Sequence, residues 1–112
     1  MEMQLSDVGA VRKIVLAGRL DTIGVDHVET KFGAAIVPGG KNTVVDLTEV
    51  SFLASMGIRM LISTTRALSR KGAKLAIFGA MPQVMEVIET TALDDIIPVA
   101  TSESEAIAIV TG

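Results

Sequence analysis

The sequence predicts an α/β fold with a mixed, mostly parallel β-sheet, an N-terminal β-hairpin and about four α-helices. Strand-like runs alternate with helix-like apolar stripes in the order β-β-α-β-α-β-α-β-α, which implies parallel strands joined by right-handed crossovers. Of the 112 residues, 49% are hydrophobic, and the mean hydropathy is +0.53. A nearly fully buried sheet accounts for this value, as does an apolar partner surface. The length predicts a single domain over residues 1–112.

The beginning of the chain predicts the hairpin and the first helix. Residues 3–6 and 11–16 are short strand-like runs, and the Asp and Gly of residues 7–10 suit a tight turn between them. Asp21 or Thr22 caps the first helix. The spacing of apolar residues predicts the buried side of this helix, which is formed by Val25, Val28, Phe32 and Ala35.

The middle of the chain predicts a strand, a connecting loop and a second helix. Residues 38–40 (Pro-Gly-Gly) end the first helix, and residues 43–47 (TVVDL) form a compact β-branched strand. Residues 48–54 are predicted to be a loop, after which Ser55 opens the second helix. Cations and a glycine at residues 70–72 end that helix, and its apolar stripe consists of Ile58, Leu61, Ile62, Thr65 and Leu68.

The last third predicts two further strand–helix pairs. Residues 74–78 (KLAIF) form a buried strand, and Pro82 suits the first turn of a helix with an inner face of Val84, Met85, Ile88 and Ala92. Residues 96–99 form a short strand whose proline indicates an edge or an end. Ser102 and Glu105 make a capping box for a final helix that carries Ile107 and Val110.

Composition excludes several classes of protein. Without Cys there is no disulfide framework, thiol chemistry or Cys-based zinc site. Ten Lys and Arg against thirteen Asp and Glu give a net charge of −3, which argues against a nucleic-acid partner. The N-terminus lacks a basic segment followed by an apolar run, and no stretch reaches the roughly 18 uncharged apolar residues of a membrane span. We therefore expect a cytoplasmic protein that does not bind membranes.

Functional groups of an open parallel sheet collect beyond the carboxyl ends of its strands. This rule selects three places, which are Asp21 with Thr22, residues 46–57 and residues 79–81. The middle segment is the most informative, because Ser55 stands at a helix N-terminus where unpaired N–H groups converge. Gly57 lies in the same first turn and removes a side chain from it.

Each of these residues also has an ordinary structural interpretation. Ser55 suits a plain N-cap, and Gly57 suits tight packing of a helix against a sheet. Asp46 suits an Asx-type cap on the following turn, and Asp21 suits a helix cap. Taken singly, no residue distinguishes a functional from a structural role.

Motifs of enzymes are incomplete in this chain. Ser55 and Gly57 match half of a G-x-S-x-G nucleophile elbow, but Leu53 stands where the first glycine belongs. The single histidine, His27, precedes the serine, whereas in the fold that carries this elbow the catalytic residues follow the order Ser, Asp, His along the chain. Too few ligands are present for a metal site. We therefore expect no catalytic activity, no cofactor and no metal.

Together, these residues resemble the STAS domain, and most closely the free-standing bacterial anti-sigma factor antagonists. The resemblance covers nearly the whole chain. Its strongest part is residues 44–58 (VVDLTEVSFLASMGI), which are similar to the family's strand, acidic turn and Phe-x-Asp-Ser-x-Gly-Leu/Ile signature. Residues 18–21 (GRLD) resemble the Gly-x-Leu-Asp before the family's first helix, and residues 72–75 (GAKL) resemble its Gly-Gly-x-Leu.

The resemblance implies a switch in protein binding. The family's phosphoacceptor maps onto Ser55, so an anti-sigma factor that is a serine kinase is expected to bind the unphosphorylated domain, which releases the sigma factor. Phosphorylation of Ser55 ends this binding, and a metal-dependent serine phosphatase restores it. The partner-binding surface is predicted to comprise Asp21, Thr22, Asp46, Ser55, Met56 and Gly57.

Two positions depart from the family pattern and keep a second interpretation open. Ala54 stands where an acidic residue usually precedes the acceptor, and Met56 stands where a small residue usually follows it. The alternative is a scaffold or sensor STAS module that is never phosphorylated and binds a small ligand or other STAS proteins. Flexible thioethers suit a surface that accepts a partner, and those near the two helix starts are Met56, Met60, Met81 and Met85.

Overall fold

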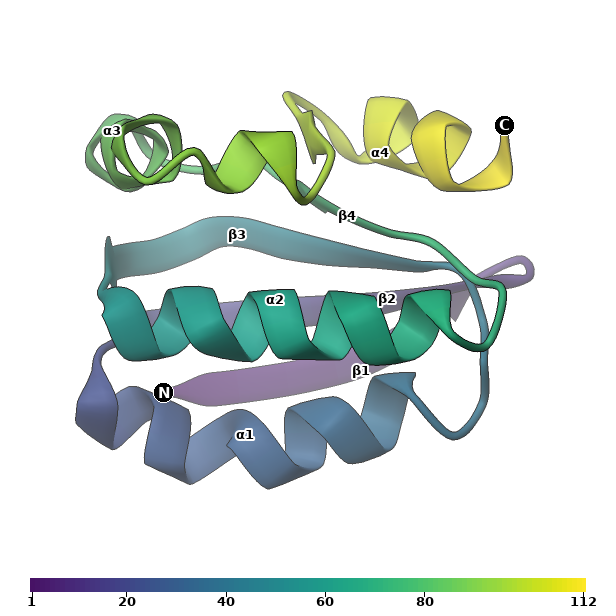
Figure 1. Ribbon diagram of the computed structural model, residues 1–112, viewed down its shortest axis with the longest axis horizontal. Coiled ribbons are helices and arrows are strands. Elements are labelled where there is room, and N and C mark those ends of the chain that lie inside the picture. Colours follow the sequence, from purple (N-terminus) through teal and green to yellow (C-terminus); the bar gives the residue numbers. More distant parts are fainter.

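The computed structural model describes all 112 residues, and its centre is a five-stranded mixed sheet in the order β1-β2-β3-β4-β5 (Figure 1). β1 pairs with β2 in an antiparallel hairpin, and the remaining neighbours are parallel. This confirms the predicted fold class. The strands are β1 (Glu2–Val8), β2 (Val11–Leu20), β3 (Thr43–Leu53), β4 (Leu75–Phe78) and β5 (Val99–Ala100). The helices are α1 (Thr22–Ile36), α2 (Ser55–Ser69), α3 (Pro82–Thr90), the 3₁₀ turn η1 (Leu93–Asp95) and α4 (Glu103–Thr111).

Helices cover the two faces of the sheet unequally. α1 and α2 lie side by side along one face (Figure 1). α3 packs into the same hydrophobic cluster through Val84 and Ile88. α4 covers the other face of β3, β4 and β5 through a smaller cluster that includes Phe78, Ala106 and Val110. Because α1 and α2 both follow a parallel strand, their N-termini lie at the same end of the molecule.

β3 is longer than the sequence predicts. The segment 48–54, expected to be a loop, continues as strand up to Leu53 and remains paired with β2. The prediction was wrong because the buried residues Leu47, Val50 and Leu53 recur every third position. A regular strand alternates its faces with a period of two, so this spacing resembles neither a strand nor a helix.

Two β-bulges cause this unusual period. Between its paired positions β3 contributes one residue more than β2 at two places, and each extra residue shifts the side-chain alternation by one. Bulges of this kind restore the buried face without interrupting the strand. The flanking pairs are Val15–Asp46 and Ala17–Glu49 at the first bulge, and Gly18–Val50 and Arg19–Phe52 at the second.

The region after α3 also differs from the prediction. α3 ends at Thr90, and Ala92, expected on its inner face, is exposed in the left-handed conformation (φ 58°). η1 follows, and the N–H of Ile96 and of Ile97 donates to the carbonyl of Leu93. Those N–H groups are therefore unavailable to a sheet. The predicted strand 96–99 is reduced to β5, which begins after Pro98.

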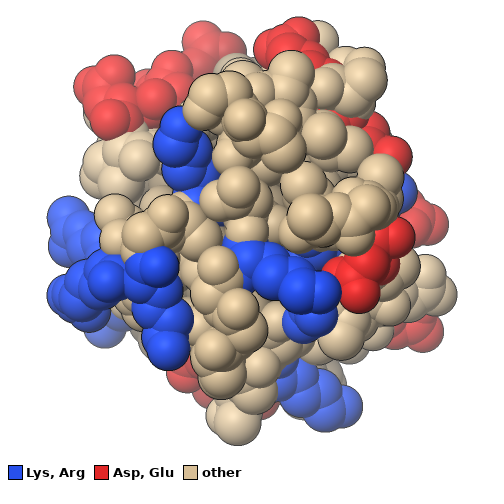
Figure 2. Space-filling model, turned by 90° about the vertical axis from the view of Figure 1, so that its right-hand side faces the viewer, with Lys and Arg blue, Asp and Glu red and all other residues tan.

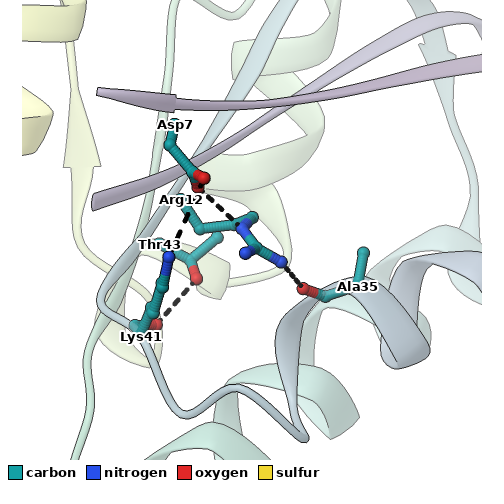
Figure 3. Close-up of polar contacts among 5 residues, drawn as sticks. All are labelled: Asp7, Arg12, Ala35, Lys41 and Thr43. Atoms are coloured by element: carbon teal, nitrogen blue, oxygen red, sulfur yellow. Dashed lines mark hydrogen bonds and ion pairs between the residues drawn. The ribbon is translucent and has the colours of Figure 1, made fainter. Parts of the chain in front are cut away.

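The amino ends of the parallel strands form a basic end of the molecule. Figure 2 looks onto this end and shows Lys and Arg side chains gathered there, with most Asp and Glu toward its margins. A polar network ties its elements together (Figure 3). Arg12 donates to Asp7 Oδ1 at 2.9 Å and to the carbonyl of Ala35 at 2.7 Å, while Lys41 lies 3.8 Å from Asp7 Oδ2. This network joins the hairpin to the last turn of α1.

Candidate functional site

Ser55 is the first residue of α2, at the end of the molecule opposite the basic one. Its side chain is exposed and makes no capping hydrogen bond. The N-cap position belongs to Ala54, whose backbone is extended and whose N–H donates to the carbonyl of Leu20 at 3.0 Å. The interpretation of Ser55 as an ordinary N-cap is therefore wrong. Its hydroxyl makes no hydrogen bond within the protein and is available to another molecule.

Asp21 and Thr22 begin α1 beside this position. Asp21 is the N-cap, because its Oδ1 accepts the N–H of Gly24 at 2.8 Å. That hydrogen bond, together with the nearby Arg19 guanidinium at 3.3 Å, lowers the pKa of Asp21 below its ordinary value. Thr22 is exposed in the first turn. The structure thus brings Asp21, Thr22 and Ser55 to the same end of the sheet.

Gly57 contributes to the site through packing. It is buried, and a Cβ added there would lie 2.9 Å from Leu53 Cδ1 and 3.0 Å from the Leu20 carbonyl oxygen. The absence of a side chain therefore lets the first turn of α2 rest directly on the ends of β2 and β3. Of its two interpretations from the sequence, the structure gives Gly57 the structural one.

Asp46 lies inside β3, and its expected place at the carboxyl edge beside Ser55 is wrong. Because β3 continues to Leu53, Asp46 is on the order of 20 Å from the end of the strand. Its Oδ1 accepts the N–H of Thr48 at 2.8 Å and the Thr48 hydroxyl at 2.7 Å. The carboxylate thus satisfies a backbone donor at the first bulge, as an Asx-type cap does.

The methionines near the helix starts divide into two groups. Met60 is 2% exposed and belongs to the core, so it offers no surface to a partner. Met56 and Met81 are half-buried against the core at the starts of α2 and α3, and Met85 has a similar exposure within α3. Of these side chains, Met56 adjoins Ser55 in the chain.

The structure adds three residues that sequence analysis did not single out as site residues. The Arg19 guanidinium lies 4.2 Å from the centre of the Phe52 ring, a distance typical of a cation–π contact. Phe52 is 39% exposed and Ile23 is 68% exposed. Only the pairing of β2 with β3 brings Arg19 and Phe52 together. The sequence signal is weak, because Phe52 falls in the segment predicted to be a loop.

A shallow depression adjoins this end of the molecule. It has a volume of about 230 Å³ and is lined by Met1, Arg19, Asp21, Ile23, Gly24 and His27. No group of three or more His, Cys, Asp or Glu side chains is placed to hold a metal ion. The helices are also too short or too polar for any of them to cross a membrane.

Comparison with known proteins relates this chain to a family. The family model of the STAS domain matches residues 3–106. The anti-sigma-B factor antagonist of Listeria monocytogenes is 29% identical over 92 residues, which cover 82% of this chain and 81% of the relative. An anti-sigma factor antagonist from Mycobacterium paratuberculosis has the same fold, with a TM-score of 0.90, 24% identity and coverage of 99% of this chain and 94% of that chain.

The anti-sigma factor antagonist SpoIIAA of Bacillus has been solved in two states. This chain matches the unphosphorylated form with a TM-score of 0.77 and 25% identity, over 99% of this chain and 97% of that one. It matches the phosphorylated form with a TM-score of 0.69 and 24% identity, over 97% of this chain and 99% of that one. The matched family model covers most of the chain and the solved relatives share its sheet order and helices. The chain belongs to the STAS domain family.

Proposed function

We propose that this chain is an anti-sigma factor antagonist that binds an anti-sigma factor kinase while Ser55 is unmodified and releases it when Ser55 is phosphorylated. The observation that carries the proposal is the exposed Ser55 hydroxyl, free of intramolecular hydrogen bonds, at the first residue of α2. The names of the relatives and the two states of SpoIIAA support the same role. A serine phosphatase that removes the phosphate completes the cycle.

The proposed docking surface surrounds Ser55. Asp21 and Thr22 flank it at the start of α1, and Met56 follows it on α2. The exposed aromatic ring of Phe52, which is stacked with Arg19, extends the surface along the ends of β2 and β3. Apolar, aromatic and charged groups are thus available together, and Arg is among the residues enriched at binding hot spots.

The physical basis of the switch is charge in a contact from which water is excluded. A phosphate adds about −1.5 to −2 charges and three acceptor oxygens. An uncompensated charge in a desolvated interface costs several kcal/mol, and about 1.4 kcal/mol is a factor of ten in affinity. Binding therefore falls by orders of magnitude without a change of fold.

Mass spectrometry tests the modification directly. The protein is incubated with ATP and a soluble extract of the source organism, and its intact mass is measured. We expect one phosphate-sized increment that disappears in Ser55→Ala. Ser63→Ala is the matched control, because Ser63 is also exposed on α2 and should keep the increment. An unmodified mass contradicts the switch and favours the non-phosphorylated scaffold or sensor.

Capture of the partner tests the binding half of the proposal. Ser55→Ala is used as bait, since it cannot be phosphorylated and released. We expect it to retain an ATP-binding kinase, identified by peptide mass spectrometry, that Ser55→Asp bait does not retain. Recovery of the same kinase in equal amounts on both baits would falsify the proposal that phosphorylation of Ser55 ends binding.

A further inference from the structure

We propose that Arg59 is the intramolecular receptor for the phosphate on Ser55, an inference that rests on the proposed function. Ser55 and Arg59 are four residues apart on α2, and both side chains are exposed. Residues at this spacing are neighbours on a helix surface, with Cβ atoms about 5–6 Å apart. Long helical side chains also lean toward the N-terminus, which directs Arg59 toward the turn that begins at Ser55.

Arg59 has no acidic partner in the unmodified protein. None of the four ion pairs of the structure includes it. α2 contains no Asp or Glu, and the residues three and four positions from Arg59 are Met56, Ile62, Ser55 and Ser63. Phosphorylation of Ser55 therefore creates an anion within reach of a guanidinium that has none.

The place of Arg59 along α2 is also unusual for a cation. Positive side chains stabilise the C-terminal turn of a helix, where Arg66 lies, and are disfavoured near the N-terminus. Arg59 stands only one turn after the first residue, and this first turn has no acidic residue to balance it. A phosphate at Ser55 supplies the missing negative charge.

The other cation near the site is already engaged. The Nε of Arg19 lies 3.3 Å from Asp21 Oδ2, and its guanidinium lies over the Phe52 ring. Moving Arg19 toward Ser55 breaks both contacts, whereas moving Arg59 breaks none. Arg59 is therefore the group that the phosphate recruits first.

The consequence is that two charged groups on the docking surface change together, the phosphate that is added and the guanidinium that it binds. The unmodified surface presents a free guanidinium beside a neutral hydroxyl. After phosphorylation, the same surface presents a dianion and no free guanidinium, because the phosphate holds Arg59 by charge-assisted hydrogen bonds. A partner that offers a carboxylate to Arg59 loses an attraction and meets a repulsion in a single step.

Titration of the phosphate by ³¹P NMR tests this inference. Phosphoserine is incorporated at position 55 during translation of the full chain, so no kinase is needed. The second pKa of phosphoserine is ordinarily about 6. We expect Arg59→Gln to raise this pKa by about 0.2–0.4, the size of a helical charge pair at this spacing. Arg59→Lys, which keeps the charge and loses the planar fork, should raise it by less.

Arg66→Gln is the matched control, because it removes the same exposed side chain from α2 about two turns further from Ser55. It should leave the phosphoserine pKa unchanged. Equal pKa values in the unsubstituted protein and Arg59→Gln overturn the inference and leave the proposed switch standing. An absent phosphate increment in the organism's extract contradicts the switch and leaves the Arg59 contact measurable.

Discussion

At the scale of single residues, Asp21 and Ser55 stand at two helix starts in different positions, because Asp21 is the N-cap of α1 whereas Ser55 follows the N-cap of α2. The Asp21 carboxylate is committed to the N–H of Gly24 and to Arg19. The Ser55 hydroxyl has no such commitment, because the extended Ala54 takes the capping position before α2. A side chain that the local backbone does not need remains available for recognition and modification.

Replacement of Asp21 separates the effects of its charge and its hydrogen bond. Asp21→Ala removes the acceptor of the α1 cap and should lower the melting temperature at pH 7. Asp21→Asn keeps an oxygen acceptor and loses the charge, so its melting temperature should fall by less than that of Asp21→Ala. Thermal unfolding followed by circular dichroism measures both variants beside the unsubstituted protein.

The pH dependence of Asp21→Asn follows from the lowered pKa of Asp21. A lowered folded-state pKa stabilises the fold at pH values above the ordinary value of 3.8, and this contribution disappears as the pH falls through the folded-state pKa. The difference in melting temperature between Asp21→Asn and the unsubstituted protein should therefore shrink as the pH is lowered from 7 to below 3. A difference that stays constant over this range contradicts the assignment.

At the scale of elements, the positions of α1 and α2 depend on glycines that let a helix touch a strand end. A Cβ on Gly24 would lie 1.9 Å from the carbonyl oxygen of Arg19, so the corner between β2 and α1 has no room for it. At Gly33, on the same helix, no atom other than its chain neighbours and the adjacent backbone of α1 lies within 4 Å of the corresponding point. The two glycines therefore have opposite roles in stability.

Alanine at these two glycines should have opposite effects. Gly33→Ala should stabilise the protein by about 0.5–1 kcal/mol, because alanine is the better helix former. Gly24→Ala gains the same propensity but forces the backbone of Arg19 to move, and we expect a net loss of about 1–2 kcal/mol. Urea denaturation at equal protein concentration measures both values. Equal changes in the two variants would contradict the packing argument.

The first bulge of β3 provides a second test at this scale. Asp46→Ala leaves the N–H and hydroxyl of Thr48 without their acceptor and should cost about 1 kcal/mol. Glu49 is an exposed neighbour on the same strand, and the free energy of unfolding of Glu49→Ala should lie within about 0.5 kcal/mol of that of the unsubstituted protein. Because Asp46 lies far from Ser55, its variant should still capture the kinase in the bait experiment. Loss of capture with a retained fold would return Asp46 to the docking surface.

At the scale of the whole molecule, the basic end and the end that carries Ser55 lie opposite one another. Cations gather at the amino ends of the parallel strands, where Arg12 and Lys41 are bound in a structural network (Figures 2 and 3). The N-termini of α1 and α2 stand at the opposite end with Ser55. A charge added there meets solvent or a partner and lies outside both hydrophobic clusters.

We therefore expect the switch to leave the stability of the fold unchanged. The free energy of unfolding of Ser55→Asp should lie within about 0.5 kcal/mol of that of the unsubstituted protein, because exposed substitutions usually have small effects. Its affinity for the captured kinase should fall at least about tenfold, which corresponds to about 1.4 kcal/mol. Chemical denaturation and isothermal titration calorimetry measure the two quantities. A large loss of stability would indicate that binding is lost through unfolding.

Local patterns in the sequence determined the element order, the hairpin, a cap at Asp21 or Thr22, the cap at Ser102, and the position of Ser55 at the start of a helix. These features depend on residues within a few positions of one another, where apolar period and capping chemistry act. The tertiary structure alone decided the length of β3, the withdrawal of Asp46 from the site and the contact of Arg19 with Phe52. Each of these depends on register between strands more than 20 residues apart in the chain, which bulges shift without a local signal.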